Sequence, residues 1–311
     1  MERLSGRNGG RGYRRRRFRR SRRAVVSVVG TLLALLVFFA LFGIFITQYL
    51  PLWMIDNESA FTAQAQASMA NLKSNVDLQL ALGNPPSYST PFTLTSAGVP
   101  LLAQPTSGTL NFIPNQAGVF ANVSMTVGPG GSGPLYRNDS LGALQMTLPN
   151  RYFSPQIFEL EDDAVIQSQS DTSQIVAFPP PLTLNTTGTQ VGVSLSLVQL
   201  IGNATQAIGA GTQEVSSHFL FSQAFTSSGP VGGGTFNGDF RLGTHFPCAW
   251  SNFLFNTLNR SGVSPTHYVL TPSTCTASNG VAHIVDLRFV NIASFTLILG
   301  TFSIVVGVGV G

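Results

Sequence analysis

The first 83 residues contain an uncharged apolar run followed by a helical repeat of apolar positions. Residues 24–47 lack charge and would form a helix about 36 Å long, enough to cross a hydrocarbon core of about 30 Å. Beyond them, apolar side chains recur every three or four positions, at Phe61, Ala65, Met69, Leu72, Val76 and Leu80. We therefore predict a transmembrane helix over 24–50 and an amphipathic helix over 51–83, with a kink or break at Pro51.

Beyond residue 84 the apolar positions alternate with a period of two. The clearest alternations cover residues 119–127, 144–148 and 191–197. Clusters rich in Gly or Pro at 128–133, 179–181 and 232–234 separate such segments. Many short strands with turns at this spacing predict a mainly antiparallel, β-sandwich-like domain over residues 84–311. Together with the helices, this pattern predicts the α+β fold class.

The C-terminal stretch 289–311 has two interpretations. It carries no charge and is long enough for a second membrane helix. However, it is dense in Val, Ile, Thr and Phe and is interrupted by Gly, and residues 284–289 already alternate like a strand. We interpret 281–310 as two closing β-strands, with a membrane helix as the alternative.

The charge of the chain is unevenly distributed. Residues 1–23 contain eleven Arg and one acid, a net charge of +10, whereas residues 24–311 carry −6. An excess of Arg before an apolar span keeps the N-terminus in the cytoplasm, so 1–23 is a cytoplasmic tail and the β-rich domain is extracellular. The tail also fits an RNA-binding arginine–glycine segment. Topology and contact with membrane lipids are the favoured interpretation, and we expect no nucleic-acid partner.

Two features fit an exported domain. Cys248 and Cys275 would pair in an oxidising compartment, and such a disulfide would contribute roughly 3–4 kcal/mol. The alternative is two separate buried thiols. Acceptor sequences for N-glycosylation begin at Asn57, Asn122, Asn138, Asn185, Asn203 and Asn259.

Few residue patterns point to chemistry. The sequence has four histidines, and no two of them are spaced as the ligands of a metal site usually are. They are His218, His245, His267 and His283. The acidic cluster Glu159, Glu161, Asp162 and Asp163 can bind a divalent cation through oxygens, but a solvated hairpin end is the favoured interpretation. A second group, Asp239 with Arg241 and His245, is interpreted as a surface arrangement. We therefore predict no catalytic, cofactor or metal site, and no enzyme.

The arginines followed by residues 24–33, AVVSVVGTLL, resemble the N-terminus of archaeal type IV pilins and pilin-like proteins. In that family a basic tail and a small residue precede a Val-Ser-X-Val-X-Gly start to an apolar helix. Residues 140–144 and 150–167 also look like parts of larger archaeal pilin-like heads. The resemblance implies cleavage by prepilin peptidase near Ala24 and Val25. It further implies a filament core built from this helix and other pilin subunits, with a β-rich head facing outward.

These observations favour a membrane-anchored, structural or adhesive subunit of a pilus-like filament. One alternative is an uncut, signal-anchored surface protein whose head binds a carbohydrate, an envelope partner or a metal ion. Another is an exported hydrolase, which would need acids or histidines gathered in a cleft.

Overall fold

The computed structural model describes residues 17–308 except 84, 101, 128–130, 139, 171–172, 188–189, 210, 229–235 and 272–282. For residues 17–27, 126–127, 131–138, 170, 187, 228 and 308 it describes the backbone alone. The chain divides into two compact units, of which the first ends at Trp53 and the second begins at Met54.

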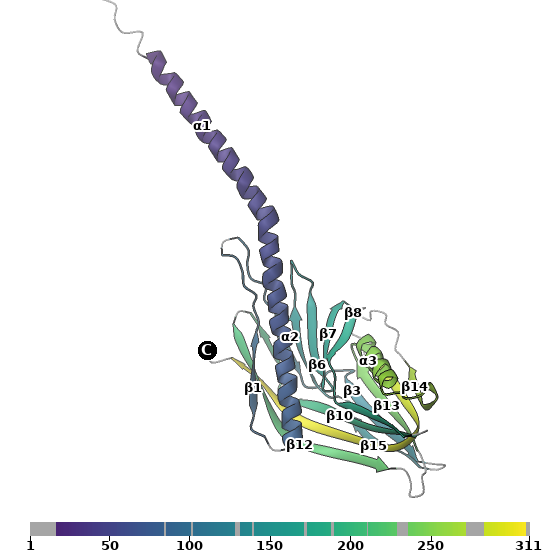
Figure 1. Cartoon of the computed structure of the whole chain (residues 1–311). Helices are drawn as coiled ribbons and strands as arrows, with labels where there is room; N and C mark the ends of the chain where they lie inside the picture. The colour runs from purple at the N-terminus through teal and green to yellow at the C-terminus, as the bar shows by residue number, and fades with distance from the viewer. Residues whose placement is uncertain are drawn as a thin grey trace, which may run out of the picture. The chain divides into compact units, whose positions relative to one another are not determined.

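The described chain begins with helical segments, of which only the part before Met54 belongs to the first unit (Figure 1). Helix α1 covers Arg17–Ile44, a π-helical turn covers Phe45–Tyr49, and helix α2 covers Leu50–Leu82. The irregularity predicted at Pro51 is the π turn directly before it, where the N–H of Leu50 donates to the carbonyl of Phe45. Proline has no N–H for the normal helical hydrogen bond, so the ladder shifts here while the chain stays helical.

The apolar side chains of α1 are exposed. Val28, Leu36 and Leu41 are more than half exposed, as are many of their apolar neighbours on every side of the helix. The helical stretch that begins at Val28 is the one candidate span in the described residues, by length and composition. A helix that is apolar all round requires lipid or protein around it.

Helix α2 presents its predicted stripe to the core of the second unit. Phe61, Ala65, Met69, Leu72 and Val76 are buried, and Leu80 is partly buried against the same cluster. Leu80 lies so close to β15 that a Cβ at Gly300 would meet its Cδ1 at 2.8 Å. The helix ends at Leu82, where Gly83 adopts a φ of +72° and its N–H donates to the carbonyl of Gln79. The amphipathic helix is therefore confirmed.

Within the described residues, the larger of two sheets has nine strands. They are β1 (Tyr88–Thr93), β3 (Phe120–Val127), β4 (Gly131–Asn138), β9 (Leu182–Thr187), β10 (Gln190–Gly202), β12 (Thr212–Ser228), β13 (Phe236–Thr244), β14 (Tyr268–Thr271) and β15 (His283–Val308). The order is β1-β12-β15-β13-β3-β4, while β10 pairs with β15 and β9, and β14 pairs with β15. The β10–β15 pair is parallel, and every other pair in this sheet is antiparallel.

The C-terminal stretch is one long strand. The first part of β15 pairs with β13 and β14, and the second part pairs with β10 and β12. Asn291 lies where the partners change and has a φ of +66°. The strand prediction for 281–310 is confirmed over the described residues, and the membrane-helix alternative is wrong. Two strands were expected, but this left-handed residue lets one strand bend without leaving the sheet.

The smaller sheet has six strands and is antiparallel throughout. Its order is β11-β2-β5-β6-β7-β8. The strands are β2 (Thr109–Ile113), β5 (Ala143–Leu148), β6 (Gln156–Glu161), β7 (Ala164–Ser170), β8 (Ser173–Phe178) and β11 (Thr205–Ile208). One buried cluster joins α2 to apolar side chains of both sheets, including Phe158 of β6 and Phe302 of β15. A long helix followed by a mostly antiparallel β-rich domain agrees with the predicted α+β class.

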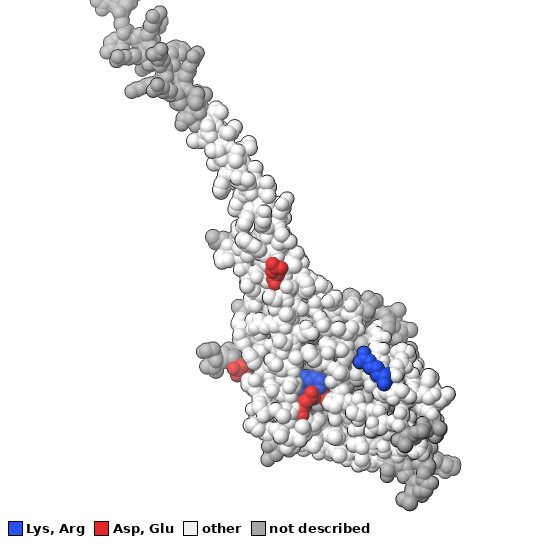
Figure 2. All heavy atoms as spheres, in the orientation of Figure 1, with Lys and Arg blue, Asp and Glu red and all other residues white. Residues whose placement is uncertain are grey.

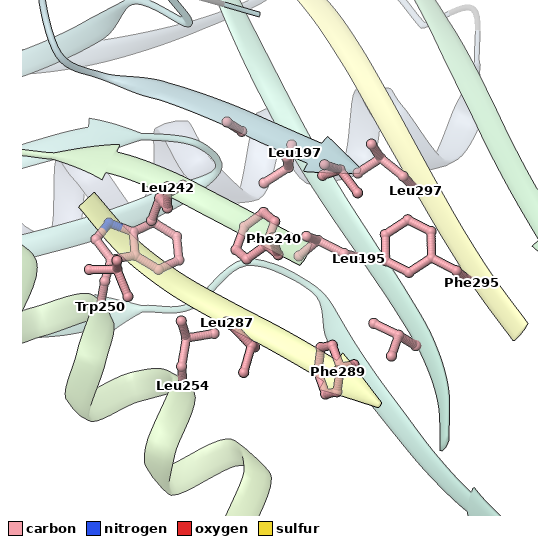
Figure 3. Packing of buried hydrophobic residues seen from close by; sticks show 14 of the residues in the cluster. Leu195, Leu197, Phe240, Leu242, Trp250, Leu254, Leu287, Phe289, Phe295 and Leu297 are labelled. Carbon is pink, nitrogen blue, oxygen red and sulfur yellow. The ribbon is translucent and has the colours of Figure 1, made fainter. Parts of the chain in front are cut away.

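A second buried cluster lies under helix α3, Pro247–Arg260. Proline at the first helical turn suits α3, since that position needs no N–H for the helical ladder. Figure 3 shows Trp250 and Leu254 of α3 facing Leu242 of β13 and Leu287 of β15. A short 3-10 helix, Pro265–His267, leads from α3 to β14.

Candidate functional site

The acidic cluster forms the turn between β6 and β7. Asp162 and Asp163 are the two loop residues of this hairpin, and the flanking pair is Glu161 with Ala164. Their φ angles are +51° and +66°, as a type I′ turn requires at both central positions. Aspartate is one of the few residues that tolerates this left-handed region. The prediction of a hairpin end is confirmed.

The prediction that this turn is solvated is wrong. Glu159 and Glu161 are fully buried, and Asp162 and Asp163 are each 1% exposed. The cover comes from elements distant in sequence, because α2 supplies Lys73 beside Asp163 and residues 244–250 lie against Glu161. We name the turn and Glu159 together the acidic turn.

The carboxyl groups of the acidic turn differ in how many hydrogen bonds they accept. Glu161 Oε1 accepts from Trp250 Nε1 at 2.7 Å and from the hydroxyl of Thr244. Glu159 Oε2 accepts from the side-chain amide of Gln145 at 2.7 Å. Within the described part of the chain, neither carboxyl oxygen of Asp162 has a hydrogen-bond partner. A buried carboxyl without donors favours its neutral form.

Burial accordingly raises the pKa values of the acidic turn. It raises the pKa of Glu159 to about 7, against hydrogen bonds from Gln145 and Gln116 that lower it. Burial and then neighbouring carboxylates hold the pKa values of Glu161 and Asp162 well above their usual range. Burial also raises the pKa of Asp163 although the positive charge of Lys73 opposes it. The acidic turn therefore retains protons at pH values where exposed carboxyls are ionised.

Lys73 links α2 to the acidic turn. Its Nζ lies 3.3 Å from Asp163 Oδ1 and 2.8 Å from Asp77 Oδ2, one helical turn further along α2. The side chains of Lys73 and Asp163 are 6% and 0% exposed, while that of Asp77 is 38% exposed. A buried amine thus lies between a buried carboxyl and a carboxyl that reaches solvent.

Glu58 on α2 is also a buried acid, but unlike the acidic turn it is surrounded by hydrogen-bond donors. It is fully buried, and its carboxylate accepts hydrogen bonds from the Thr106 hydroxyl at 2.6 Å and from three consecutive backbone N–H groups. Those donors are Arg151, Tyr152 and Phe153, at 3.1, 2.7 and 2.7 Å. Burial alone would raise the pKa of Glu58, but these hydrogen bonds outweigh it and lower the pKa below its usual value.

Sequence reasoning missed Glu58 as a structural residue. The available signal was its position, because Glu58 falls three residues before Phe61 on the apolar stripe that also contains Met54. An acid on the buried face of a helix needs donors from elsewhere in the fold.

The remaining candidate groups are separate from one another. Asp239 pairs with Arg288 at 3.2 Å and Arg241 with Asp286 at 3.5 Å, across β13 and β15. Both arginines are more than half exposed, so the predicted surface arrangement is confirmed for these strands. His245 instead contacts the side-chain amide of Gln116 at 2.8 Å, and burial lowers its pKa. Among the described residues, no three His, Cys, Asp or Glu are arranged to hold a metal ion.

The predicted modification sites are distributed over several elements. Ala24 and Val25 lie in α1, in its backbone-only part. Asn185, Asn203 and Asn259 are exposed and Asn57 and Asn122 partly exposed, while the side chain of Asn138 is outside the described residues. Cys248 is buried at the start of α3, and Cys275 lies outside the described residues, so their pairing stays a prediction.

A groove between β8 and α3 is lined by side chains of several chemical kinds. Its volume is about 390 Å³, and its lining includes Ile175, Asn252, Phe253, Asn256 and Arg260. Amide, guanidinium and apolar surfaces therefore meet there. Figure 2 shows how sparse charged side chains are on the face in view. Arg260 is the one charged residue among the described residues that line the groove.

Comparison with known proteins places no constraint on the function. No family model matches the sequence, no curated protein matches it, and no solved structure matches the fold.

Proposed function

We propose that this protein is a membrane-anchored, archaeal pilin-like surface subunit with a structural or adhesive role in a filament. Its N-terminus is cytoplasmic until prepilin peptidase cleaves near Ala24 and Val25, and its head is outside the cell. The observation that carries the proposal is the contrast between two helical segments. The stripe of α2 is buried within its own unit, whereas the apolar side chains of α1 are exposed on every side.

That contrast favours a particular division of roles. The amphipathic half of the helix already has its apolar face covered, so α2 is committed to the head. The exposed side chains of α1 require lipid before assembly and other copies of α1 after it. The β-rich head, which we propose to be sandwich-like, would then be the outward-facing part. Exposed acceptor residues such as Asn203 and Asn259 suit a glycosylated head.

The N-terminal residue of the mature protein tests this proposal. Mass spectrometry of protein from its native membrane should find a chain that begins at Ala24 or Val25. An intact Met1, or a cut near Ala67, would contradict processing as a pilin. In intact cells that lack prepilin peptidase, external protease should digest the head and spare the residues before the span. Digestion of the tail instead would reverse the proposed orientation.

The groove between β8 and α3 favours a second candidate, a surface protein that binds carbohydrate. Amides such as Asn252 and Asn256 can hydrogen-bond sugar hydroxyls, while Phe253 offers an apolar face. Titration calorimetry with oligosaccharides from the cell envelope tests this role. Asn256→Ala should weaken binding at least tenfold, and Asn203→Ala, which is exposed outside the groove, should not. Equal affinity of both variants and the wild type would exclude the groove as the carbohydrate-binding site.

A further inference from the structure

The composition of the chain singles out Lys73. Sixteen of the 17 basic residues are arginine, and Lys73 is the single lysine in the sequence. Arginine is the better residue for a buried ion pair, because its guanidinium forms two parallel hydrogen bonds and is more weakly hydrated. The chain nevertheless has its one primary side-chain amine here, between α2 and the acidic turn. An amine can act as a nucleophile, which a guanidinium does poorly.

We propose that Lys73 and Asp163 form an intramolecular amide bond that joins α2 to the β6–β7 turn. The reactive groups already touch, since Nζ lies 3.3 Å from Oδ1 and both side chains are almost inaccessible to solvent. Because Cγ is bonded to Oδ1, this contact also holds Nζ near the carbon that it would attack, and such held proximity favours reaction. The bond would connect positions 90 residues apart. This inference does not depend on the proposed role in a filament.

The surroundings supply the proton transfers. Asp77 contacts the same Nζ through both carboxyl oxygens, at 2.9 and 2.8 Å, and takes one proton from the ammonium group. The neutral amine then attacks Cγ of protonated Asp163, so that a C–N bond forms. A second Nζ proton passes to the Asp163 hydroxyl, the C–O bond breaks, and water leaves. One amine and one carboxylic acid give one amide and one water, without oxidant, reductant or cofactor.

The state of Asp163 suits this reaction. Burial raises its pKa, so the carboxyl is held in the neutral, electrophilic form, and Asp163 Oδ2 has no hydrogen-bond partner within the described residues. Asp77 is the less suitable acyl donor, because it is 38% exposed and belongs to the same helix as the amine. Asp77 is therefore assigned as a positioning residue that carries protons.

The single lysine makes the test simple. Full-length protein is purified from membranes, reduced, denatured and treated with a lysine-specific endoproteinase. The amide predicts a chain that stays in one piece and has a mass lower by one water. A second digestion, after arginine, should then give a fragment in which the peptides of Lys73 and Asp163 are joined. Asp163→Gly should have its full mass and be cut after Lys73. Glycine suits this control because the position has a φ of +66°.

Two further variants separate an amide from an ion pair. Lys73→Arg keeps the positive charge and should have its full mass. Asp77→Asn should lower the joined fraction at least tenfold, which a purely structural contact would not do. Wild-type protein that keeps its full mass and is cut at Lys73, before and after incubation of the folded protein at pH 4–8, would overturn the proposal and leave a buried ion pair. Loss of water as an imide at Asp163, not joined to Lys73, would also overturn it.

Discussion

Two buried regions of the head hold carboxyl groups in opposite states. Glu58 and the acids of the acidic turn are all at most 1% exposed, although less protein surrounds Glu58 than surrounds the acidic turn. Glu58 receives four hydrogen bonds and its pKa is lowered, whereas Asp162 receives none within the described residues and its pKa is raised. The depth of burial and the number of donors that the fold directs at an acid therefore decide together whether the acid is charged.

The strongest test of this comparison is the pH dependence of stability. Glu159 has a pKa of about 7 in the folded protein against a usual value of 4.5. A raised folded pKa contributes stability that is present below the unfolded pKa and lost as pH rises through the folded one. From pH 4.5 to 8, we expect the free energy of unfolding to fall by on the order of 3 kcal/mol from Glu159 alone. The other three acids of the acidic turn act in the same direction.

Denaturant titrations at several pH values measure this loss. Fluorescence of Trp250 reports the unfolding of the head, in a Trp53→Phe background that removes the other tryptophan. If the amide at Asp163 forms, that carboxyl no longer titrates and the slope comes from the remaining three. A stability that is constant or rises between pH 5 and 8 would show that the acidic turn is charged in the folded state.

Glu58→Gln tests the buried acid that has many donors. It should give the next largest change in the free energy of unfolding. The substitution removes the charge and leaves backbone N–H groups at Tyr152 and Phe153 with a weaker acceptor. At pH 7 we expect a loss of about 2–3 kcal/mol in the free energy of unfolding. The loss should shrink at low pH, because a lowered folded pKa contributes stability only while the acid is ionised.

Asp56→Asn is the matched control on the same helix. Asp56 is exposed, so its substitution should change stability by less than about 0.5 kcal/mol. Equal effects of Glu58→Gln and Asp56→Asn would mean that the four hydrogen bonds to Glu58 add nothing to stability.

Asp162→Asn should stabilise the protein, which distinguishes the two regions most directly. The neutral amide avoids burial of an unpartnered charge, and asparagine accepts the φ of +51° at this position. At pH 8 the free energy of unfolding should increase by about 1–2 kcal/mol. The gain should be smaller at pH 4.5, where Asp162 is already neutral. A loss at both pH values would indicate that the Asp162 carboxylate has a stabilising partner in the folded protein.

The sequence predicts the elements of the head better than its buried polar groups, for a physical reason. The stripe of α2 and the strand state of β15 follow from local periodicity and β-propensity, which neighbouring residues determine. The turn at Asp162 and Asp163 was also predictable as a hairpin. Its burial was not, because the covering groups Lys73 and Trp250 lie about 90 residues away in sequence. Glu58 shows the same limit, although its place on the apolar stripe was a usable signal.

The ion pairs between β13 and β15 place carboxylates at the solvent-exposed surface, in contrast to the two buried regions. Breaking one of them should change the free energy of unfolding least. Asp239 pairs with Arg288, whose side chain is 57% exposed, so solvent already stabilises both charges. Asp239→Asn should therefore lower the free energy of unfolding by at most about 0.5 kcal/mol, and added salt should reduce even that difference. A double-mutant cycle with Arg288→Gln measures the interaction itself. A coupling as large as the effect of Glu58→Gln would contradict the rule that directed donors matter most where water is excluded.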